Sequence, residues 1–206
     1  MKLGDCTQLI QGVSVNRFET CDLNEDSLSV RLLTLKEFNE TLGLSYRMSQ
    51  ERSTEVVIRK DKLTADLLTD TTSLIWHTLT QKVAYLPAIH SGLLISNNFI
   101  KVQFTDPVDL WFLEWYLNEH PTIQKQIASF SEGSVISSLK LSHLKDIGLV
   151  LPSLEKQQFL GKIAQLKKRK IMLMKEKMEL QQQYLDQSLI HTIELLNTRR
   201  NKHDNK

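Results

Sequence analysis

LKLSHLKDIGLVLPSLEKQ, the stretch from Leu139 to Gln157, decides how this chain is organised. It predicts a short helical turn and then a strand that stops at Pro152, because proline cannot donate a ladder hydrogen bond. Ser153 is a suitable N-cap for a following helix, and Glu155 favours its first turn. No proline follows, and no glycine follows Gly161. The sequence therefore predicts one long, uninterrupted C-terminal helix.

The predicted helix carries apolar side chains at spacings of three and four residues, with one five-residue step from Leu166 to Ile171. The pattern is typical of a coiled coil with a register defect. A helix to about Asn197 is about 60 Å long, whereas a domain of the remaining residues is roughly 30 Å across. We therefore expect part of it to project and to dimerise through Phe159, Ile163, Leu166, Ile171, Met174, Met178, Leu185 and Leu189. A hairpin near Lys167 or Gln183 is the alternative, although neither place offers glycine or proline.

The residues before the helix predict a mixed domain of the α+β class. Strands are expected where β-branched residues cluster or alternate, at 13–15, 30–35, 55–58, 74–79, 82–86 and 98–104. Asp106 and Pro107 are expected to open a helix as cap and first residue, and Pro121 to open a second that ends near Phe130. The predicted organisation is a globular domain over 1–152, a spacer helix over 153–198 and a polar tail over 199–206.

Composition places the chain among ordinary globular proteins, with 41% hydrophobic and 24% charged residues. It contains no run of 18 apolar residues and no apolar leader, so we expect a cytoplasmic protein. Cys6 and Cys21 are too few for a disulfide framework and are expected to be reduced. The net charge of +2 is uneven. Residues 1–152 hold 14 basic and 18 acidic side chains, a net of −4, whereas residues 153–206 hold 12 and 6, a net of +6.

Catalytic motifs are missing from the sequence. It has no Pro-Pro pair and no Gly-x-Gly, which argues against an adenine methyltransferase and a phosphate-binding loop. The one nuclease-like triplet, Asp204-Asn-Lys206, lies in the polar tail. The histidines are dispersed, so His77, His90 and His143 are interpreted as structural or surface groups and not as metal ligands. We expect no catalytic residue, no metal and no cofactor in this chain.

Six short segments are informative through their order and spacing: residues 2–5, 9–12, 95–100, 113–118, 132–144 and 149–157. Together they resemble the DNA-specificity subunit of type I restriction–modification systems, and the Leu-Pro-Ser-Leu-Glu-Lys-Gln stretch that ends at Gln157 is the most specific part. Thr69 departs from the pattern, because many members have glycine there.

The resemblance implies a non-catalytic subunit. In that family, a target-recognition domain reads half of a split DNA sequence, and a long helix sets the spacing and docks methyltransferase subunits that carry S-adenosylmethionine. A translocating restriction subunit is a further candidate partner. Family members usually contain two domains and two helices, whereas this chain has one of each, which implies a half-subunit that pairs with itself. Such a dimer would read an inverted repeat in double-stranded DNA with a fixed gap.

DNA reading requires basic groups for phosphates and a few side chains that reach base edges. The richest local supply is the loop near position 50 with the basic residues after it: Tyr46, Arg47, Gln50, Arg52, Arg59, Lys60 and Lys62. A second group follows Gly12: Ser14, Asn16 and Arg17. Further candidates are Gln81, Lys82, Asn97, Asn98 and Ser134. A solvated loop is the alternative for the first group, and turn formation is the better interpretation of the two asparagines.

The predicted helix carries a compact basic run of Lys167, Lys168, Arg169 and Lys170. It is either a solvated face or a set of phosphate contacts between the half-sites, which would steepen the salt dependence of binding. Trp111 and Trp115 are expected in the core rather than on a stacking platform.

Two other functions stay open. The mild acidity of residues 1–152 favours a coiled-coil scaffold whose globular part binds a protein. A truncated or silent cassette of a longer specificity subunit is the third hypothesis, which neighbouring reading frames would test.

Overall fold

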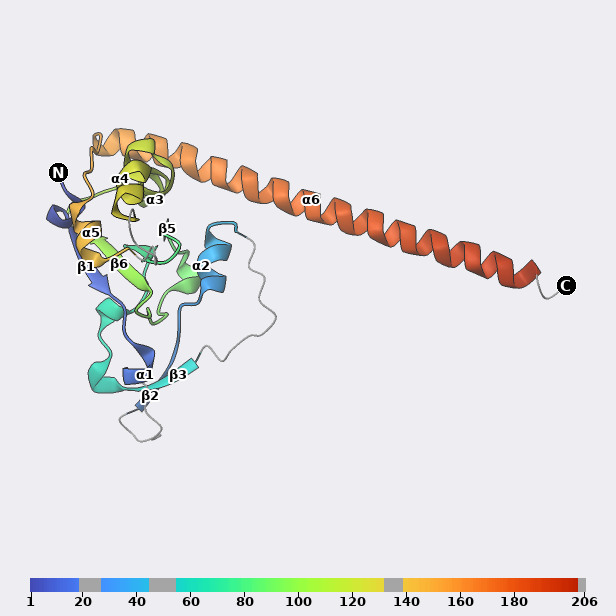
Figure 1. Ribbon diagram of the computed structural model, residues 1–206, viewed down its shortest axis with the longest axis horizontal. Coiled ribbons are helices and arrows are strands. Elements are labelled where there is room, and N and C mark those ends of the chain that lie inside the picture. The colour runs from blue at the N-terminus through green and yellow to red at the C-terminus, as the bar shows by residue number, and fades with distance from the viewer. Residues whose placement is uncertain (19–26, 45–54, 132–138, 204–206) are drawn as a thin grey trace. The chain divides into compact units, whose positions relative to one another are not determined.

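The computed structural model describes residues 1–18, 27–44, 55–131 and 139–203, without the side chains of 18, 131 and 195–203. The chain divides into two compact units, Met1–Gln165 and Leu166–Lys206. The first unit combines strands with short helices and ends in the opening turns of a long helix (Figure 1). The α+β class predicted from the sequence is confirmed. Among the described residues, no helix is both long and apolar enough to cross a bilayer.

The main sheet has four antiparallel strands in the order β1 (Thr7–Gln11), β6 (Phe99–Phe104), β4 (Leu74–His77) and β5 (Lys82–Ala84). Both of its faces are covered, because alternate side chains enter different cores. On β4, Leu74 and Trp76 join one core while Ile75 joins another. Three of the predicted strands are therefore confirmed, and two of them are shorter at their carboxyl ends than expected.

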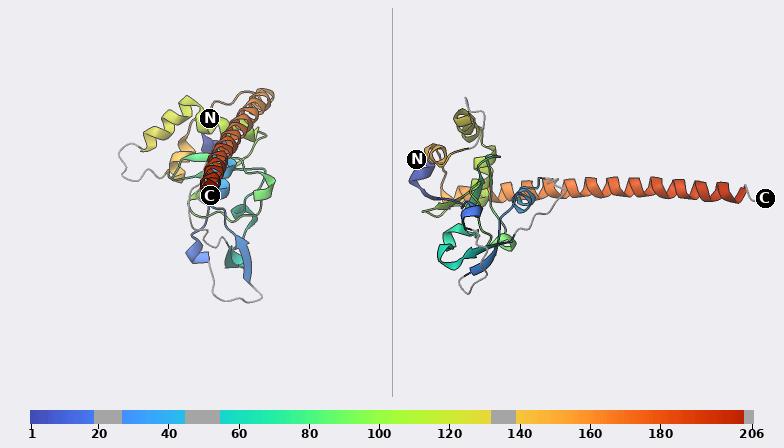
Figure 2. Two further views of the ribbon diagram at one scale, coloured as in Figure 1. Left: turned by 90° about the vertical axis from the view of Figure 1, so that its right-hand side faces the viewer. Right: turned by 60° about the horizontal axis from the view of Figure 1, so that its bottom comes forward.

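The long helix α6 (Leu154–His203) begins where the sequence predicts and ends later than Asn197. The right-hand view of Figure 2 shows it as one uninterrupted helix, so the hairpin alternative is wrong. The Ser153 carbonyl accepts from the Gln157 N–H at 2.9 Å, as an N-cap carbonyl does.

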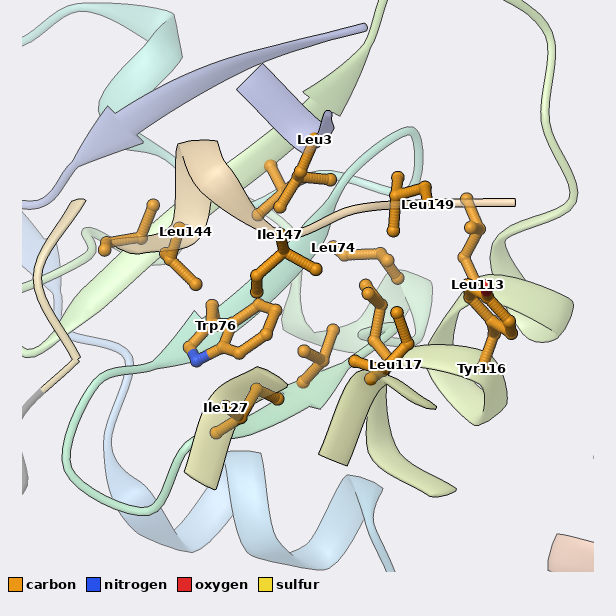
Figure 3. Packing of buried hydrophobic residues seen from close by; sticks show 14 of the residues in the cluster. Leu3, Leu74, Trp76, Leu113, Tyr116, Leu117, Ile127, Leu144, Ile147 and Leu149 are labelled. Carbon is orange, nitrogen blue, oxygen red and sulfur yellow. The ribbon is translucent and has the colours of Figure 1, made fainter. Parts of the chain in front are cut away.

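One face of the main sheet packs against α3 (Leu110–Glu119), α4 (Pro121–Ser131) and α5 (Leu141–Asp146). Figure 3 shows Trp76 surrounded by Leu117, Ile127 and Ile147. Trp115 is partly buried against this core, and Trp111 meets Tyr85 edge to face with ring centroids 5.2 Å apart. Both tryptophans therefore serve packing.

Contact between α3 and the first turns of α6 includes Gly161, where an added Cβ would lie 2.0 Å from Asp109 Oδ1. The absence of a side chain at Gly161 thus permits the close approach of the two helices.

The second core lies between the other sheet face and α2 (Leu35–Thr41), with Phe38 fully buried. A third core is built on a separate two-stranded sheet of β2 (Ser27–Arg31) and β3 (Glu55–Arg59). Leu94 joins these layers by backbone bridges to Leu32 and Leu68. Short connecting helices are α1 (Val15–Phe18), η1 (Leu3–Asp5), η2 (Lys60–Lys62), η3 (Ala65–Leu67) and η4 (Ala88–His90).

Two predicted boundaries are wrong: the end of the strand expected over 30–35 and the start of the helix expected after Asp106. Asp106 does not cap α3. That role falls to Asp109, whose Oδ1 accepts from Phe112 N–H at 2.7 Å. The strand predicted over 30–35 ends at Arg31, because Thr34 forms a capping box with Glu37 and so starts α2.

Two further predicted strands are absent. At 13–15, Val13 makes one bridge to Ser96, and the chain then turns into α1. Before Pro152, Gly148 makes one bridge to Lys2. The side-chain amide of Gln126 hydrogen-bonds to both backbone groups of Gly148. Gly148 N–H donates to Gln126 Oε1 at 2.7 Å, and Gln126 Nε2 donates to the Gly148 carbonyl at 3.1 Å. Residues 1–3 pair with this segment on one side, where Leu3 N–H donates to the Ile147 carbonyl and Leu149 N–H to the Met1 carbonyl, both at 2.8 Å. On the other side the Gln126 side chain takes the place of a neighbouring strand.

Candidate nucleic-acid interface and exposed helix seams

The structure brings two predicted DNA-binding groups together. Asn16 and Arg17 are exposed on α1, which contacts β3. Lys62 Nζ donates to the Arg17 carbonyl at 3.4 Å although the two residues are 45 positions apart. Figure 1 shows α1 beside β2 and β3. Exposed Lys60 and Lys62 on η2 therefore extend the basic surface that begins at Arg17.

Arg59 is held by an acidic neighbour that the sequence reasoning did not consider. Its Nε donates to Asp61 Oδ1 at 3.0 Å and its second terminal nitrogen donates to Oδ2 at 2.7 Å. The side-chain hydrogen bond from Arg59 lowers the pKa of Asp61. Because the Arg59 guanidinium already makes two hydrogen bonds to the Asp61 carboxylate, a phosphate or a guanine must displace Asp61 to bind Arg59 in the same way.

Strand register places the other described candidates at one end of the main sheet. Gln11 pairs with Ile100, and His77 pairs with Phe99 and with Lys82. The segment before α1, the turn at 97–98 and the turn before Lys82 therefore all leave the same sheet end. Three interstrand spacings separate the edge strands β1 and β5, which is about 14 Å. Ser14 is half-buried in that segment, and its carbonyl accepts from Arg17 N–H at 2.9 Å.

Asn97 and Asn98 form a turn, in which Phe99 N–H donates to the Ser96 carbonyl at 2.8 Å. Their backbone carbonyls also accept, from Gln11 Nε2 at 2.7 Å and from Thr78 N–H at 2.9 Å respectively. Both side chains are exposed. Turn formation is confirmed, and it leaves the exposed amides available as candidate base readers.

Gln81 and Lys82, at the same sheet end, are half-buried. Gln81 has a φ of 57°, and it is the one non-glycine residue with positive φ in the ranges that the structure describes. Such a conformation is uncommon for glutamine, and here it closes the turn between β4 and β5, in which Gln81 N–H donates to the His77 carbonyl at 2.9 Å.

Several predicted residues cannot be placed. Cys21 and the candidates Tyr46, Arg47, Gln50, Arg52 and Ser134 lie outside the described residues. The histidines are placed, and two of them are structural. His77 is buried, which lowers its pKa, and its Nδ1 lies 2.9 Å from Thr80 Oγ1. His143 stacks on Phe130 with centroids 5.1 Å apart. No group of three or more metal-ligating side chains occurs within the described part of the chain.

A buried ion pair was missed by the sequence reasoning. Lys101 is 1% exposed, and its Nζ lies 2.6 Å from Asp70 Oδ2 and donates to the Leu68 carbonyl at 2.7 Å. Desolvation opposes ionisation of Asp70, but hydrogen bonds from Lys101, Ser73 and Thr72 outweigh it and lower the pKa to about 2. The pair ties β6 to the segment after η3. Asp70-Thr-Thr-Ser73, which has the composition of a side-chain-capped turn, was the available signal.

Helix α6 carries two exposed seams with the coiled-coil spacing of four and three residues. Seam A consists of Phe159, Ile163, Leu166, Lys170, Leu173, Lys177, Leu180 and Tyr184. Seam B is shifted by one residue and consists of Leu160, Ala164, Lys167, Ile171, Met174, Met178, Gln181 and Leu185. Successive helical residues differ by about 100°, so the seams face different directions.

Apart from half-buried Ala164, the apolar members of both seams are exposed. Exposure reaches 67% at Phe159, 70% at Tyr184 and 67% at Met178. Among the predicted dimerisation residues, the first three belong to seam A, the next four belong to seam B, and Leu189 follows them at 63% exposure. The five-residue step from Leu166 to Ile171 is the point at which the predicted dimerisation residues pass from seam A to seam B.

The basic run is not a single face. Lys167, Arg169 and Lys170 are exposed and Lys168 is half-buried. Lys167 lies in seam B and Lys170 in seam A. At most part of the run can therefore face any one partner.

No family model matches the chain, and no curated protein matches it. Solved structures do match. A chain from a structure of the assembly and conformational transition of the type I R-M system aligns with a TM-score of 0.60 and 14% identity, over 88% of this chain and 45% of that one. The fold is similar to that of this matched chain from a type I R-M system. The chain spans less than half the length of that first match.

Two further matches are weaker. The HsdS subunit from Thermoanaerobacter tengcongensis aligns with a TM-score of 0.49 and 10% identity, over 84% of this chain and 37% of that one. The type I restriction-modification S subunit from M. genitalium aligns with a TM-score of 0.44 and 15% identity, over 81% and 37%.

Proposed function

We propose that this chain is a non-catalytic DNA-specificity subunit of a type I restriction–modification system, present as a half-length form. Its globular unit would read one half of a split DNA target. Helix α6 would pair with a second copy and dock methyltransferase subunits, which would bring S-adenosylmethionine and extrude the target adenine. A restriction/translocase subunit is a further proposed partner, and the whole complex is proposed to be cytoplasmic.

The observation that carries the proposal is the junction between the globular unit and α6. Gln157 Oε1 accepts from Asp109 N–H at 3.2 Å, while its Nε2 donates to the Pro152 carbonyl at 2.9 Å. Together with the close approach at Gly161, these bonds fix the first turns of α6 to α3. A reading domain whose α3 is bonded to the first turn of a helix with two largely exposed seams is suited to a spacing device. The fold similarity to type I chains supports the same function.

DNA binding is proposed for the surface that includes α1, η2 and the sheet-end turns. Arg17, Lys60 and Lys62 would meet phosphates and fix orientation, which carries no sequence information. Asn16, Asn97 and Gln81 would reach base edges, since amides pair with adenine in the major groove.

Two seams support two kinds of helical partner. A helix that pairs with one other helix needs one narrow stripe, whereas a broader apolar face fits a bundle. One seam would serve the second copy, and the other would serve a methyltransferase subunit.

The test is selection of bound sequences from a random duplex library by the full chain with its methyltransferase subunit, at two salt concentrations. The expected result is an inverted repeat with a fixed gap, since a two-fold dimer presents two equal readers. The matched control replaces Arg17 and Lys62 by Gln, which should weaken binding to all sequences about equally. An asymmetric selected motif would contradict the homodimer, and absence of any preferred sequence would contradict the specificity function.

A scaffold without DNA specificity is the second candidate. It is favoured by the net charge of −4 over residues 1–152 and by the Arg59–Asp61 pair. In that case the chain would retain its helical partners in the same experiment and select no sequence.

A further inference from the structure

The two seams of α6 differ in whether they can pair with themselves. We infer that seam A, and not seam B, joins two copies of this chain, in an antiparallel pair of one defined register. This inference rests on the proposed homodimer and adds to it which face pairs and which residues meet. It follows from the spacing and charge of described, exposed residues between Phe159 and Tyr184.

A parallel in-register pair of seam A would set Lys170 and Lys177 each against its own mate in the core, which favours the antiparallel orientation. Antiparallel pairing reverses the heptad order of the second helix, so each a position faces a d position. In seam A, Phe159, Leu166, Leu173 and Leu180 repeat every seven residues and take the d positions. Full overlap sets Phe159 against Tyr184 of the second copy and Ile163 against its Leu180. Leu166 then faces Lys177, and Lys170 faces Leu173. Every layer includes a large apolar side chain, and the two lysines can extend their charged ends to water along their aliphatic stems.

Charges beside the seam select this register. Arg169 and Glu176 occupy g positions, which flank the a positions, and the full-overlap register sets Arg169 against Glu176 of the second copy, twice by symmetry. No ion pair involves either residue within the described chain. A shift of one heptad in one direction sets Arg169 against its own symmetry mate, and this repulsion opposes the Lys162–Glu176 pairs that the same shift forms. A shift in the other direction sets Glu176 against its own mate.

The charges that flank seam B oppose antiparallel pairing of that seam with itself. Its g positions include Lys170 and Lys177. Full antiparallel overlap of seam B sets Lys170 against Lys177 of the second copy, and a shift of one heptad either way sets one of these lysines against itself. Like charges oppose pairing in all three registers. Seam B is therefore left for a different partner, whose flanking side chains would be acidic.

Disulfide cross-linking of the full chain tests the register. The variant carries both Leu166→Cys and Lys177→Cys, at positions 11 residues apart on one helix and therefore too far apart to bridge within it. Mild oxidation is expected to convert most of this variant to a covalent dimer on a non-reducing gel. Oxidised wild type, which keeps Cys6 and Cys21, gives the background.

Control variants separate the alternatives. Leu166→Cys alone cross-links when the helices are parallel, and Leu166→Cys with Tyr184→Cys cross-links when the register is shifted by one heptad. Either result would overturn the inference. A dimer seen by light scattering without any of these cross-links would also overturn it, while the proposed homodimer stands. A chain that stays monomeric at every concentration would contradict both.

Charge exchange gives an independent readout. Glu176→Arg is expected to raise the dimer dissociation constant roughly tenfold at low salt, since two attractive pairs become repulsive. Adding Arg169→Glu restores the pairs and should return the constant to near wild type, and high salt should reduce the difference. Glu179→Arg is the matched control, because position 179 lies away from both seams and changes the charge equally. An equal effect of Glu176→Arg and Glu179→Arg would show that only net charge matters and would overturn the register.

Discussion

Single residues decide much of the stability of the globular unit, and Lys101 is the clearest case. Its ammonium is buried and meets both Asp70 and the Leu68 carbonyl. Removing one partner of such a pair leaves an uncompensated charge, which typically costs more than the pair contributes. The position looked like an ordinary strand residue in the sequence, because a lysine within an apolar run gives no sign of where its partner lies.

We predict that Lys101→Ala lowers the free energy of unfolding by about 2 kcal/mol, since it removes a charge-assisted hydrogen bond and leaves Asp70, which is one-third exposed, without its counter-charge. Urea denaturation followed by circular dichroism measures the change. The control is the double variant Lys101→Met with Asp70→Asn, which removes both charges and should recover most of the stability. Equal destabilisation in the single and double variants would contradict this role of the pair.

Asp70 also predicts a pH dependence of stability. Its pKa is lowered from 3.8 to about 2 in the folded chain. A carboxyl group with a lowered folded pKa contributes stability above the unfolded value and loses it as pH falls. The contribution should therefore be complete above about pH 5 and disappear between about pH 4 and pH 2. Denaturant unfolding over this range should show a steeper decline for the wild type than for Asp70→Asn.

At the scale of elements, caps and close contacts set where helices begin and how they meet. The start of α6 and the helix opened by Pro121 were predicted correctly, because each depends on a local backbone rule. The start of α2 and the true cap of α3 were missed. Asp109 had a competing candidate in Asp106, and α2 was missed because the apolar residues of 30–35 predicted a strand that hid the capping box at Thr34.

Gly161 gives a prediction at this scale. Alanine in place of glycine within a helix usually adds about 1 kcal/mol of stability. Here the new Cβ would lie 2.0 Å from Asp109 Oδ1 and 3.0 Å from Phe112 N. Gly161→Ala should therefore lower the free energy of unfolding by about 1–3 kcal/mol, as overpacking does. Thermal unfolding measures it, and Asp109→Ser, a shorter cap, should relieve the effect of Gly161→Ala. A stabilised single variant would show that α6 is not held against α3 at this point.

At the scale of the whole molecule, the proposed pairing would set a length. In the full-overlap register, residue 157 lies opposite residue 186 of the second copy, so equivalent junctions are separated by 29 residues. At about 1.5 Å per residue this is roughly 44 Å along the helix axis. Half-sites read by a two-fold dimer lie about 34–36 Å apart, or a multiple of that, because this is one turn of B-DNA. The proposed separation of the two junctions is of the same order.

The basic run on α6 gives the prediction at this scale. Replacing Lys167, Lys168, Arg169 and Lys170 with Gln should flatten the plot of log K against log salt for DNA binding. The slope changes by about 0.9 for each phosphate that the protein no longer neutralises. The preferred sequence should stay the same, because binding to phosphates carries no base information. An unchanged slope of log K against log salt would show that these four side chains form a solvated helix face and do not contact DNA. Since Arg169 also belongs to the proposed dimer interface, the oligomeric state should be measured in parallel.

The sequence by itself determined the α+β class, the break at Pro152, the long helix and its apolar spacing. These features depend on neighbours within a few positions, where backbone sterics and helical periodicity act. Only the tertiary structure decided that Lys62 meets Arg17, that Lys101 meets Asp70 and that the three turns leave the same end of the sheet. Contacts of this kind join residues tens of positions apart, and strand register and core packing, which no local pattern encodes, bring them together.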